Sequence, residues 1–386
     1  MAIMASIGSR MVALLLGVGL LQVTSLTLAL AHSAPAPSWR PLAALPAPTA
    51  GLAATRLPDG SVLAVGGDAS TGTNTELAAR FSLQSGSWHR LPNAPVPLAT
   101  PAVLALNMHA VLVVAPSIAN GTMAAPSKAL ILDPLRGQWL SLPSCPVALF
   151  QPRLLQLNAH EVLAVGGIGD TIGAIFDRST QRWTPLASPV AALSTYTLAA
   201  LPDGRAMLVA SVAIDAQHQP AMVRQAFALT AAHTWQTLAR PPIAVDGEQA
   251  VALDDHRILL AGGYGLADDP SAPVPPALIY DVHLDRWSVA GATGADHRGA
   301  QLVALAGGRA LLIGGHGPDG QPSAGCLLFD GSRWQAAQPL PGPWAGYALV
   351  TLADGSVLLI GGDRPSSDGF TTVADTMLLP LGTPQG

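Results

Sequence analysis

Short apolar runs separated by polar turns recur along the chain from about residue 38 to residue 380. The stretch LPDGSVLAVGG at 57–67 shows the pattern, because an Asp-Gly turn precedes an apolar run that ends in two glycines, and VLAVGG returns unchanged at 162–167. Asp-Gly readily adopts the positive φ that a tight hairpin turn needs. The pattern therefore predicts β-strands joined by hairpins along most of the chain.

The apolar runs belong to a repeat whose most regular landmark is a tryptophan. Seven tryptophans follow one another at intervals of 44 to 52 residues: Trp39, Trp88, Trp139, Trp183, Trp235, Trp287 and Trp334. The position 27 residues later opens a glycine pair in five of the seven repeats: Gly66 and Gly67, Gly166 and Gly167, Gly262 and Gly263, Gly314 and Gly315, and Gly361 and Gly362. Ala115-Pro116 and Ala210-Ser211 hold this position in the other two. A period of this length predicts a repeat architecture.

Each repeat holds apolar segments for four strands, of which the third often ends in Asp and the short fourth carries the tryptophan. Four antiparallel strands per repeat predict an all-β fold, a seven-bladed β-propeller. The pattern resembles the kelch repeat, in which a Gly-Gly pair closes the second strand and a Trp follows. The resemblance implies a kelch propeller over residues 38–386, with glycines where inner strands crowd together and tryptophans between blades. A phosphate loop would instead need one glycine-rich loop before a helix.

The two ends of the repeat region are incomplete in a complementary way. The last repeat has three strands and no tryptophan after them, whereas SWRPLA at 38–43 carries Trp39 without a complete blade before it. We expect this N-terminal strand to complete the last blade, which would close the ring and remove the open sheet edges. An open arc of blades is the alternative.

Residues 1–31 differ from the repeats and have the pattern of a secretory signal peptide. Arg10 precedes an apolar stretch that ends in Ala29-Leu30-Ala31, an Ala-x-Ala cleavage pattern, and residues 32–37 form a short linker. The alternative is an uncleaved membrane anchor, because about 20 apolar residues span a bilayer. Polar residues within the stretch favour cleavage. We therefore expect an exported protein (periplasmic, secreted or at the cell surface) that contacts a membrane only if this segment is retained.

Composition narrows the classes of partner. The chain is 49% hydrophobic and 11% charged, with a net charge of −5 and no basic block, so nucleic acid is not an expected partner. Its two cysteines, Cys145 and Cys326, form no disulfide framework. They fall in blades on different sides of the predicted ring, too far apart for a bridge. We expect a monomer stabilised by its apolar core.

Chemistry-bearing side chains gather in the last three blades, on the face that carries the loops between blades. Blades 1 to 4 offer mostly Ser, Thr, Asn, Pro and Ala there, whereas blades 5 to 7 carry acidic, basic and aromatic residues. The candidate ligand-binding residues are Glu248, Tyr264, His297, Arg298, His316, Trp344, Tyr347, Asp363 and Arg364. Aromatic and polar groups at one mouth suit a sugar, with Trp344 as an apolar platform. An ordinary loop surface is the alternative.

The sequence favours a non-catalytic binding or scaffold propeller with a protein or glycan ligand at this loop face. No G-x-S-x-G motif and no metal-binding histidine spacing is present, so we assign no catalytic residue and expect neither a cofactor nor a metal. The alternative is a carbohydrate-active enzyme at the mouth of blades 5 to 7. A distant resemblance to the galactose oxidase central domain implies a Cys–Tyr cross-link, for which Cys145 and Tyr196 are the candidates, but the Tyr-His pair of that family is absent. Bacterial kelch proteins also include sialic acid mutarotases, so an epimerase or mutarotase is a second form of this alternative.

The N-terminal pattern gives the first testable prediction. We expect the mature chain to begin near His32, because cleavage follows the small residues of the Ala-x-Ala pattern. N-terminal sequencing of the protein from its native compartment checks this. A chain that still begins at Met1 in a soluble cytoplasmic fraction would contradict export.

Overall fold

The computed structural model describes residues 37–119, 122–167, 170–190, 193–216, 219–243, 245–265, 274–295 and 297–381. The predicted signal peptide and all but the last residue of the linker lie outside the described residues. The propeller is formed by the unit Pro37–Gly386. Among the described residues, no helix has the length and apolar character to cross a membrane.

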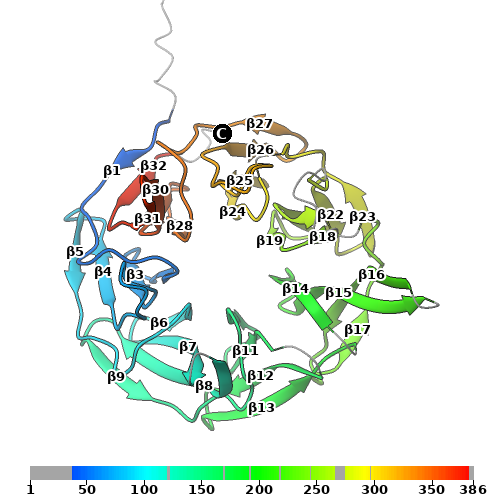
Figure 1. The fold of residues 1–386 in the computed structure, drawn as a ribbon. Helices are drawn as coiled ribbons and strands as arrows, with labels where there is room; N and C mark the ends of the chain where they lie inside the picture. Colours follow the sequence, from blue (N-terminus) through cyan, green and yellow to red (C-terminus); the bar gives the residue numbers. More distant parts are fainter. Residues whose placement is uncertain are drawn as a thin grey trace, which may run out of the picture. The chain divides into compact units, whose positions relative to one another are not determined.

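Seven four-stranded antiparallel sheets form a closed ring of blades around a central opening, as predicted (Figure 1). The strands of each blade are given from the inner to the outer one. Blade 1 has β2 (Ala53–Arg56), β3 (Val62–Val65), β4 (Ala78–Ser82) and β5 (Ser87–Arg90), and blade 2 has β6 (Ala102–Asn107), β7 (Ala110–Ala119), β8 (Thr122–Asp133) and β9 (Gln138–Ser141). Blade 3 has β10 (Arg153–Gln156), β11 (Glu161–Val165), β12 (Thr171–Asp177) and β13 (Arg182–Ala187), and blade 4 has β14 (Leu193–Ala200), β15 (Ala206–Ala216), β16 (Gln219–Leu229) and β17 (Trp235–Thr237). Blade 5 has β19 (Gln249–Ala252), β20 (Arg257–Ala261), β22 (Leu278–Asp281) and β23 (Arg286–Val289), and blade 6 has β24 (Gln301–Leu305), β25 (Arg309–Ile313), β26 (Cys326–Phe329) and β27 (Trp334–Ala336). Blade 7 has β28 (Ala348–Thr351), β29 (Val357–Ile360), β32 (Thr376–Leu379) and β1 (Arg40–Pro41).

The N-terminal strand closes the ring, as the sequence predicted. In blade 7, β1 pairs antiparallel with β32, with Arg40 opposite Leu378 and Pro41 opposite Met377. In Figure 1 the blue β1 lies beside the red β32 at the outer edge of this blade. The inner strands of neighbouring blades contact one another all the way round, including β2 of blade 1 with β28 of blade 7. An open arc is therefore excluded.

The core consists of seven apolar layers, one between each pair of neighbouring blades. The second strand of each blade supplies both of its adjacent layers, because side chains alternate between the two faces of a strand. In β3, for example, Val62 and Ala64 pack toward blade 7, whereas Leu63 and Val65 pack toward blade 2. All four side chains are fully buried. This explains why the second strands are continuous apolar runs without alternation.

The repeat tryptophans join neighbouring blades by hydrogen bonds as well as by apolar contact. In five of them the indole Nε1 donates to a backbone carbonyl just after, or at the end of, the outer strand of the preceding blade. These pairs are Trp39 with Gln338 (3.3 Å), Trp139 with Pro92 (3.0 Å), Trp183 with Pro143 (2.8 Å), Trp235 with Ala187 (2.9 Å) and Trp287 with Ala239 (2.7 Å). The even spacing of the tryptophans thus reflects one contact that recurs around the ring.

The glycine pairs end the second strand of their blades. Gly66 and Gly67 have φ values of 66° and 95°, and a Cβ on Gly67 would meet the carbonyl oxygen of Ala50, so a side chain is excluded by both conformation and space. In blades 2 and 4, which lack the pair, the second and third strands run on into long hairpins, β7–β8 and β15–β16. Two short pairs outside the repeat pattern, β18 (Val245–Asp246) with β21 (Tyr264–Gly265) and β30 (Asp363–Ser366) with β31 (Gly369–Thr372), were not predicted.

Both cysteines are free thiols, as predicted. Cys145 packs in the layer between blades 2 and 3, and Cys326 packs between blades 6 and 7. Burial raises the pKa of each thiol to about 11. Tyr196 packs between blades 3 and 4, in a different layer from Cys145, so the structure does not bring the two residues of the implied cross-link together.

Ring closure gives the second prediction. Deleting residues 32–43 from the mature protein removes β1 and Trp39, whose side chain is only 9% exposed. Loss of a buried tryptophan alone costs about 3–5 kcal/mol, and for a domain of this size that corresponds to a fall in Tm of about 4–7 °C. Thermal unfolding followed by circular dichroism measures it, with a deletion of residues 32–36 as the matched control. An unchanged Tm in the longer deletion would contradict closure by β1.

Candidate functional site

A cavity of about 620 Å³ opens at the end of the central channel where the inner strands begin. We call it the axial mouth. Its walls come from the first residues of β2, β6, β10, β19, β24 and β28 and from the loops that lead into them, so it lies on the face of the inter-blade loops. Its polar side chains include Gln151, Arg153, Gln249 and Gln301. The volume lies in the range of small-molecule sites.

The rim of the axial mouth has a recurring backbone conformation. Twelve residues after the repeat tryptophan, the chain has a positive φ in six of the seven repeats, at Gly51, Thr100, Gln151, Gly247, Gly299 and Gly346. Four of these residues are glycines, which adopt that conformation without penalty. Thr100 (φ 32°) and Gln151 (φ 43°) are not, and each precedes a proline, which normally pushes the preceding residue toward extended backbone. Blades 2 and 3 therefore carry backbone strain at the rim.

Arg153, the first residue of β10, reaches across the axial mouth. Its Nη1 donates to Oε1 of Gln249 in blade 5 at 3.3 Å, past the inner strand of blade 4. Although the side chain is exposed to the channel, it is surrounded by protein, and desolvation lowers the pKa of its guanidinium while the nearby Tyr196 opposes that shift. An arginine in a protein nevertheless stays charged. The axial mouth therefore holds a fixed positive charge.

Of the nine predicted site residues, Tyr264 offers an exposed aromatic ring at the rim, 41% exposed. It packs over two rim glycines, because a Cβ on Gly247 would collide with its ring and one on Gly299 would lie 2.7 Å from its hydroxyl. Gly299 also lines the axial mouth. The backbone of Tyr264 pairs with Asp246. The ring therefore has one face on the loops of blades 5 and 6.

Blade 6 and blade 7 repeat this backbone pairing. Arg298 and His316 form a β-bridge with N···O distances of 3.3 and 2.8 Å, and Ala345 and Asp363 form the equivalent bridge. The residues that follow the glycine pairs are thus tied to the inter-blade loops, which places Tyr264, His316 and Asp363 in equivalent positions of successive blades.

Glu248 is buried beneath the loop face. Its carboxylate forms an ion pair with Arg224 of β16, and both side chains are at most 3% exposed. Arg224 also donates to Ser211 Oγ at 3.0 Å, and the backbone carbonyl of Glu248 accepts a bond from Thr197. A cavity of about 10 Å³ borders the pair, room for one water molecule beside Glu248 Oε2, which has no hydrogen-bond partner among the described residues. In this arrangement Glu248 joins blade 4 to blade 5.

His297, Trp344 and Tyr347 are also buried. His297 Nδ1 donates to the carbonyl of Gly314 at 2.9 Å, and the Tyr347 hydroxyl donates to that of Ile313 at 3.0 Å; burial raises the pKa of Tyr347. The Trp344 ring, 1% exposed, donates from Nε1 to the Gly361 carbonyl at 3.0 Å. These three side chains support the backbone where the glycine pairs turn, and the Trp344 ring has almost no surface for stacking a ligand.

Arg364 covers Trp344. Its guanidinium carbon lies 3.9 Å from the ring centroid, and it forms an ion pair with Asp375 at 2.9 Å. A ligand approaching blade 7 would therefore meet Arg364 before the tryptophan.

Two carboxylates approach each other where blade 7 meets blade 1. Asp68 and Asp363 follow the glycine pairs of these blades and lie beside the rim glycines Gly51 and Gly346, within 3.7 and 3.4 Å of the points that Cβ atoms there would occupy. Desolvation, and then the charge of Asp363, raise the pKa of Asp68. Asp363 accepts a hydrogen bond from Thr372 at 2.7 Å.

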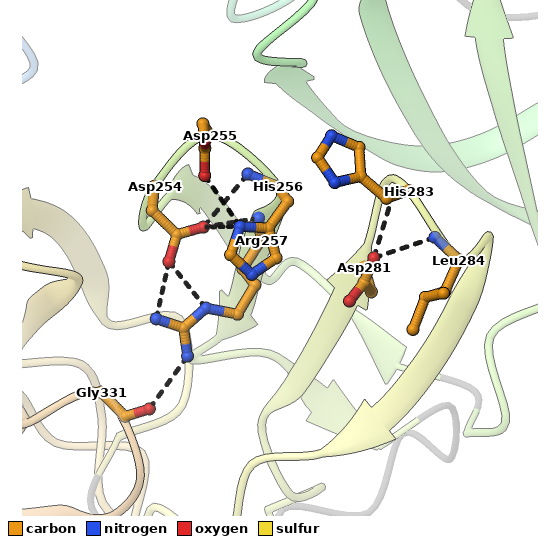
Figure 2. Close-up of polar contacts among 8 residues, drawn as sticks. All are labelled: Asp254, Asp255, His256, Arg257, Asp281, His283, Leu284 and Gly331. Atoms are coloured by element: carbon orange, nitrogen blue, oxygen red, sulfur yellow. Dashed lines mark hydrogen bonds and ion pairs between the residues drawn. The ribbon is translucent and has the colours of Figure 1, made fainter.

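On the opposite face, the turn between β19 and β20 brings together Asp254, Asp255 and His256 (Figure 2). Their oxygen and nitrogen atoms that could coordinate a metal ion lie within 4.8 Å of one another. Asp254 already accepts two backbone N–H groups and a side-chain bond from Arg257 at 2.7 Å. A hydrogen bond to Asp255 raises the pKa of His256. The Arg257 charge neutralises Asp254, so the cluster stabilises the turn.

Sequence reasoning missed Arg153, the three glutamines and Asp68. Part of this site could have been found from the position twelve residues after each repeat tryptophan. Glycine occupies that position in four repeats, whereas Thr100 and Gln151 replace it in two others. That position marks the first residues of each inner strand, which face the channel once the ring closes.

Comparison with known proteins agrees with the fold. No family of known proteins matches the chain, and no curated protein sequence matches it. A solved structure titled "Structure of YjhT" aligns over 87% of this chain and 96% of its own, with a TM-score of 0.52 and 16% sequence identity. At this identity the likeness concerns the fold alone.

The Arg224–Glu248 pair gives the third prediction. Arg224→Met alone should lower the free energy of unfolding by about 3–5 kcal/mol, because it leaves a buried carboxylate without its counter-charge. The double variant Arg224→Met/Glu248→Leu removes both charges and should recover most of that loss. Urea unfolding of the wild type, both single variants and the double variant measures the coupling. Additive effects would show that the two side chains do not depend on each other.

Proposed function

We propose that this protein is an exported, kelch-type propeller that binds a glycan at the axial mouth without chemically changing it. Support comes mainly from one observation: a cavity of about 620 Å³ on the loop face combines amide and guanidinium side chains with the exposed ring of Tyr264 at its rim. Sugars are held by such combinations of an aromatic face and directed hydrogen bonds. The signal-peptide pattern of residues 1–31 supports export.

A glycan suits the loop face better than a folded protein partner does. Protein interfaces have a well-packed apolar centre. Here the exposed large apolar side chains among the described residues are distributed over blades 1, 2, 3, 5 and 7: Leu83, Leu135, Leu140, Phe150, Tyr264, Leu284, Val289 and Phe370. A polar, open cavity of about 620 Å³ favours a ligand the size of one or two sugar rings.

A glycan array probed with the mature protein tests the proposal, and this is the fourth prediction. Tyr264→Ala should weaken the best-bound glycan about threefold to tenfold, the scale of one aromatic contact. Phe150→Ala, which removes an aromatic side chain 55% exposed on the loop face of blade 3, is the matched control and should bind normally. If only Phe150→Ala weakens binding, the ligand lies over blade 3 instead. An array without any bound glycan, together with capture of a specific protein, would replace the proposal by a scaffold function.

A carbohydrate-active enzyme is the second candidate, favoured by the pair Asp68 and Asp363. A carboxyl group whose pKa is raised by desolvation and by a neighbouring acid, as that of Asp68 is, is a candidate general acid. In that case the array ligand would be altered over time, and Asp68→Asn would abolish the change while leaving binding intact. Incubation with the bound glycan, followed by NMR of the sugar, separates the two candidates.

A further inference from the structure

We propose that the axial mouth binds an anionic ligand whose carboxylate or phosphate group pairs with Arg153, while Gln151, Gln249 and Gln301 hold its polar remainder. This inference rests on the proposed function, because it names the chemical class of the ligand at the same site.

The axial mouth carries one unbalanced positive charge. Among the described residues that line the axial mouth, Arg153 is the only charged side chain. Its hydrogen-bond partner is the neutral amide of Gln249, and its strongest electrostatic neighbour is Tyr196, whose phenol is kept neutral because burial raises its pKa. No carboxylate lies within ion-pair distance of Arg153 in the described part of the chain. A cation in a protein-walled cavity without a counter-ion favours an anionic ligand.

The hydrogen bond from Arg153 to Gln249 is weak enough for a ligand to replace it. At 3.3 Å, this bond is long for an N–H···O contact. A carboxylate or phosphate accepts two parallel N–H groups of a guanidinium, and such charge-assisted bonds are about twice as strong as neutral ones. A ligand oxyanion would therefore displace the Gln249 oxygen from Arg153, and the freed amide would then bind the ligand.

The backbone beside Arg153 is strained. Gln151 and Thr100 hold positive φ values at rim positions where four other repeats have glycine. Strain of this kind persists at binding sites, where a side chain must be placed despite its conformational cost. Gln151 lies two residues before Arg153, so a glycine there would relieve the strain and remove an amide from the site.

Acidic and basic side chains lie on different sides of the axial mouth. Asp68 and Asp363 lie beside Gly51 and Gly346, on the side where blades 7 and 1 meet, whereas Arg153 belongs to blade 3. Like charges repel an oxyanion from the first side and opposite charges attract it to the second. A ligand with an oxyanion at one end and hydroxyl groups at the other would be oriented by both.

Isothermal titration with three hexoses that differ only at carbon 6 tests the inference: D-glucuronate, D-glucose 6-phosphate and D-glucose. We expect at least one of the two anions to bind at least about tenfold more tightly than glucose, the scale of a hydrogen bond to a charged group. Preference for glucuronate identifies a carboxylate, and preference for glucose 6-phosphate identifies a phosphate. Equal affinity for glucose and both anions, or no binding of either anion, would overturn the inference; the glycan array decides the proposed function separately.

Variants of the protein test whether Arg153 is the residue that binds the anionic group. Arg153→Gln should remove the preference for the anion, whereas Arg56→Gln, which removes the same charge at the far end of inner strand β2, should keep it. Gln151→Gly should raise Tm and weaken anion binding together. If Arg153→Gln is folded by circular dichroism and retains the preference, Arg153 does not bind the ligand.

Discussion

Each blade of this propeller is apolar on both faces, and it buries both only when it lies between two other blades. The second strands show the constraint most clearly, because all four side chains of β3 are fully buried while they face two different neighbours. A single blade would expose both of its apolar faces to solvent. Stability is therefore a property of the closed ring, and the short β1, with two paired residues, is placed where the ring would otherwise remain open.

Crowding near the axis determines where the chain leaves its strands. Where two glycines follow the second strand, positive φ values turn the chain into a loop that pairs with the preceding inter-blade loop, as at Ala50 with Asp68 and Ala345 with Asp363. Where the pair is missing, the strands continue as hairpins. The polar residues of the loop face are thus positioned by a packing requirement, and blades with and without the pair present different surfaces to a ligand.

The blade count, strand order and closure could be predicted from the sequence because tryptophans and glycine pairs recur in register, and each landmark corresponds to one contact between blades. The site could be predicted only in part. The sequence placed His297, Trp344 and Tyr347 in loops, but a loop position does not tell whether a side chain points outward or supports the turn beneath it. All three hydrogen-bond to carbonyls next to or within the glycine pairs. Glu248 was similarly hidden, because its partner Arg224 lies on the third strand of another blade.

Arg153 escaped detection for a different physical reason. On the linear sequence it is, with Arg56, one of two arginines at the start or end of an inner strand, and nothing in its neighbourhood singles it out. Its significance arises from closure, which surrounds the first residues of the inner strands with protein and leaves the guanidinium facing an amide of blade 5. Residues at the regular positions of the repeat form the contacts between blades, so packing explains them. The residues that break the repeat at the rim, Thr100 and Gln151, bear a conformational cost that packing does not require, since glycine fits the same position in four other blades. Thr100 and Gln151, the departures from the repeat at strained positions, line the axial mouth, whereas the loop residues His297 and Trp344 support the turns beneath the loops.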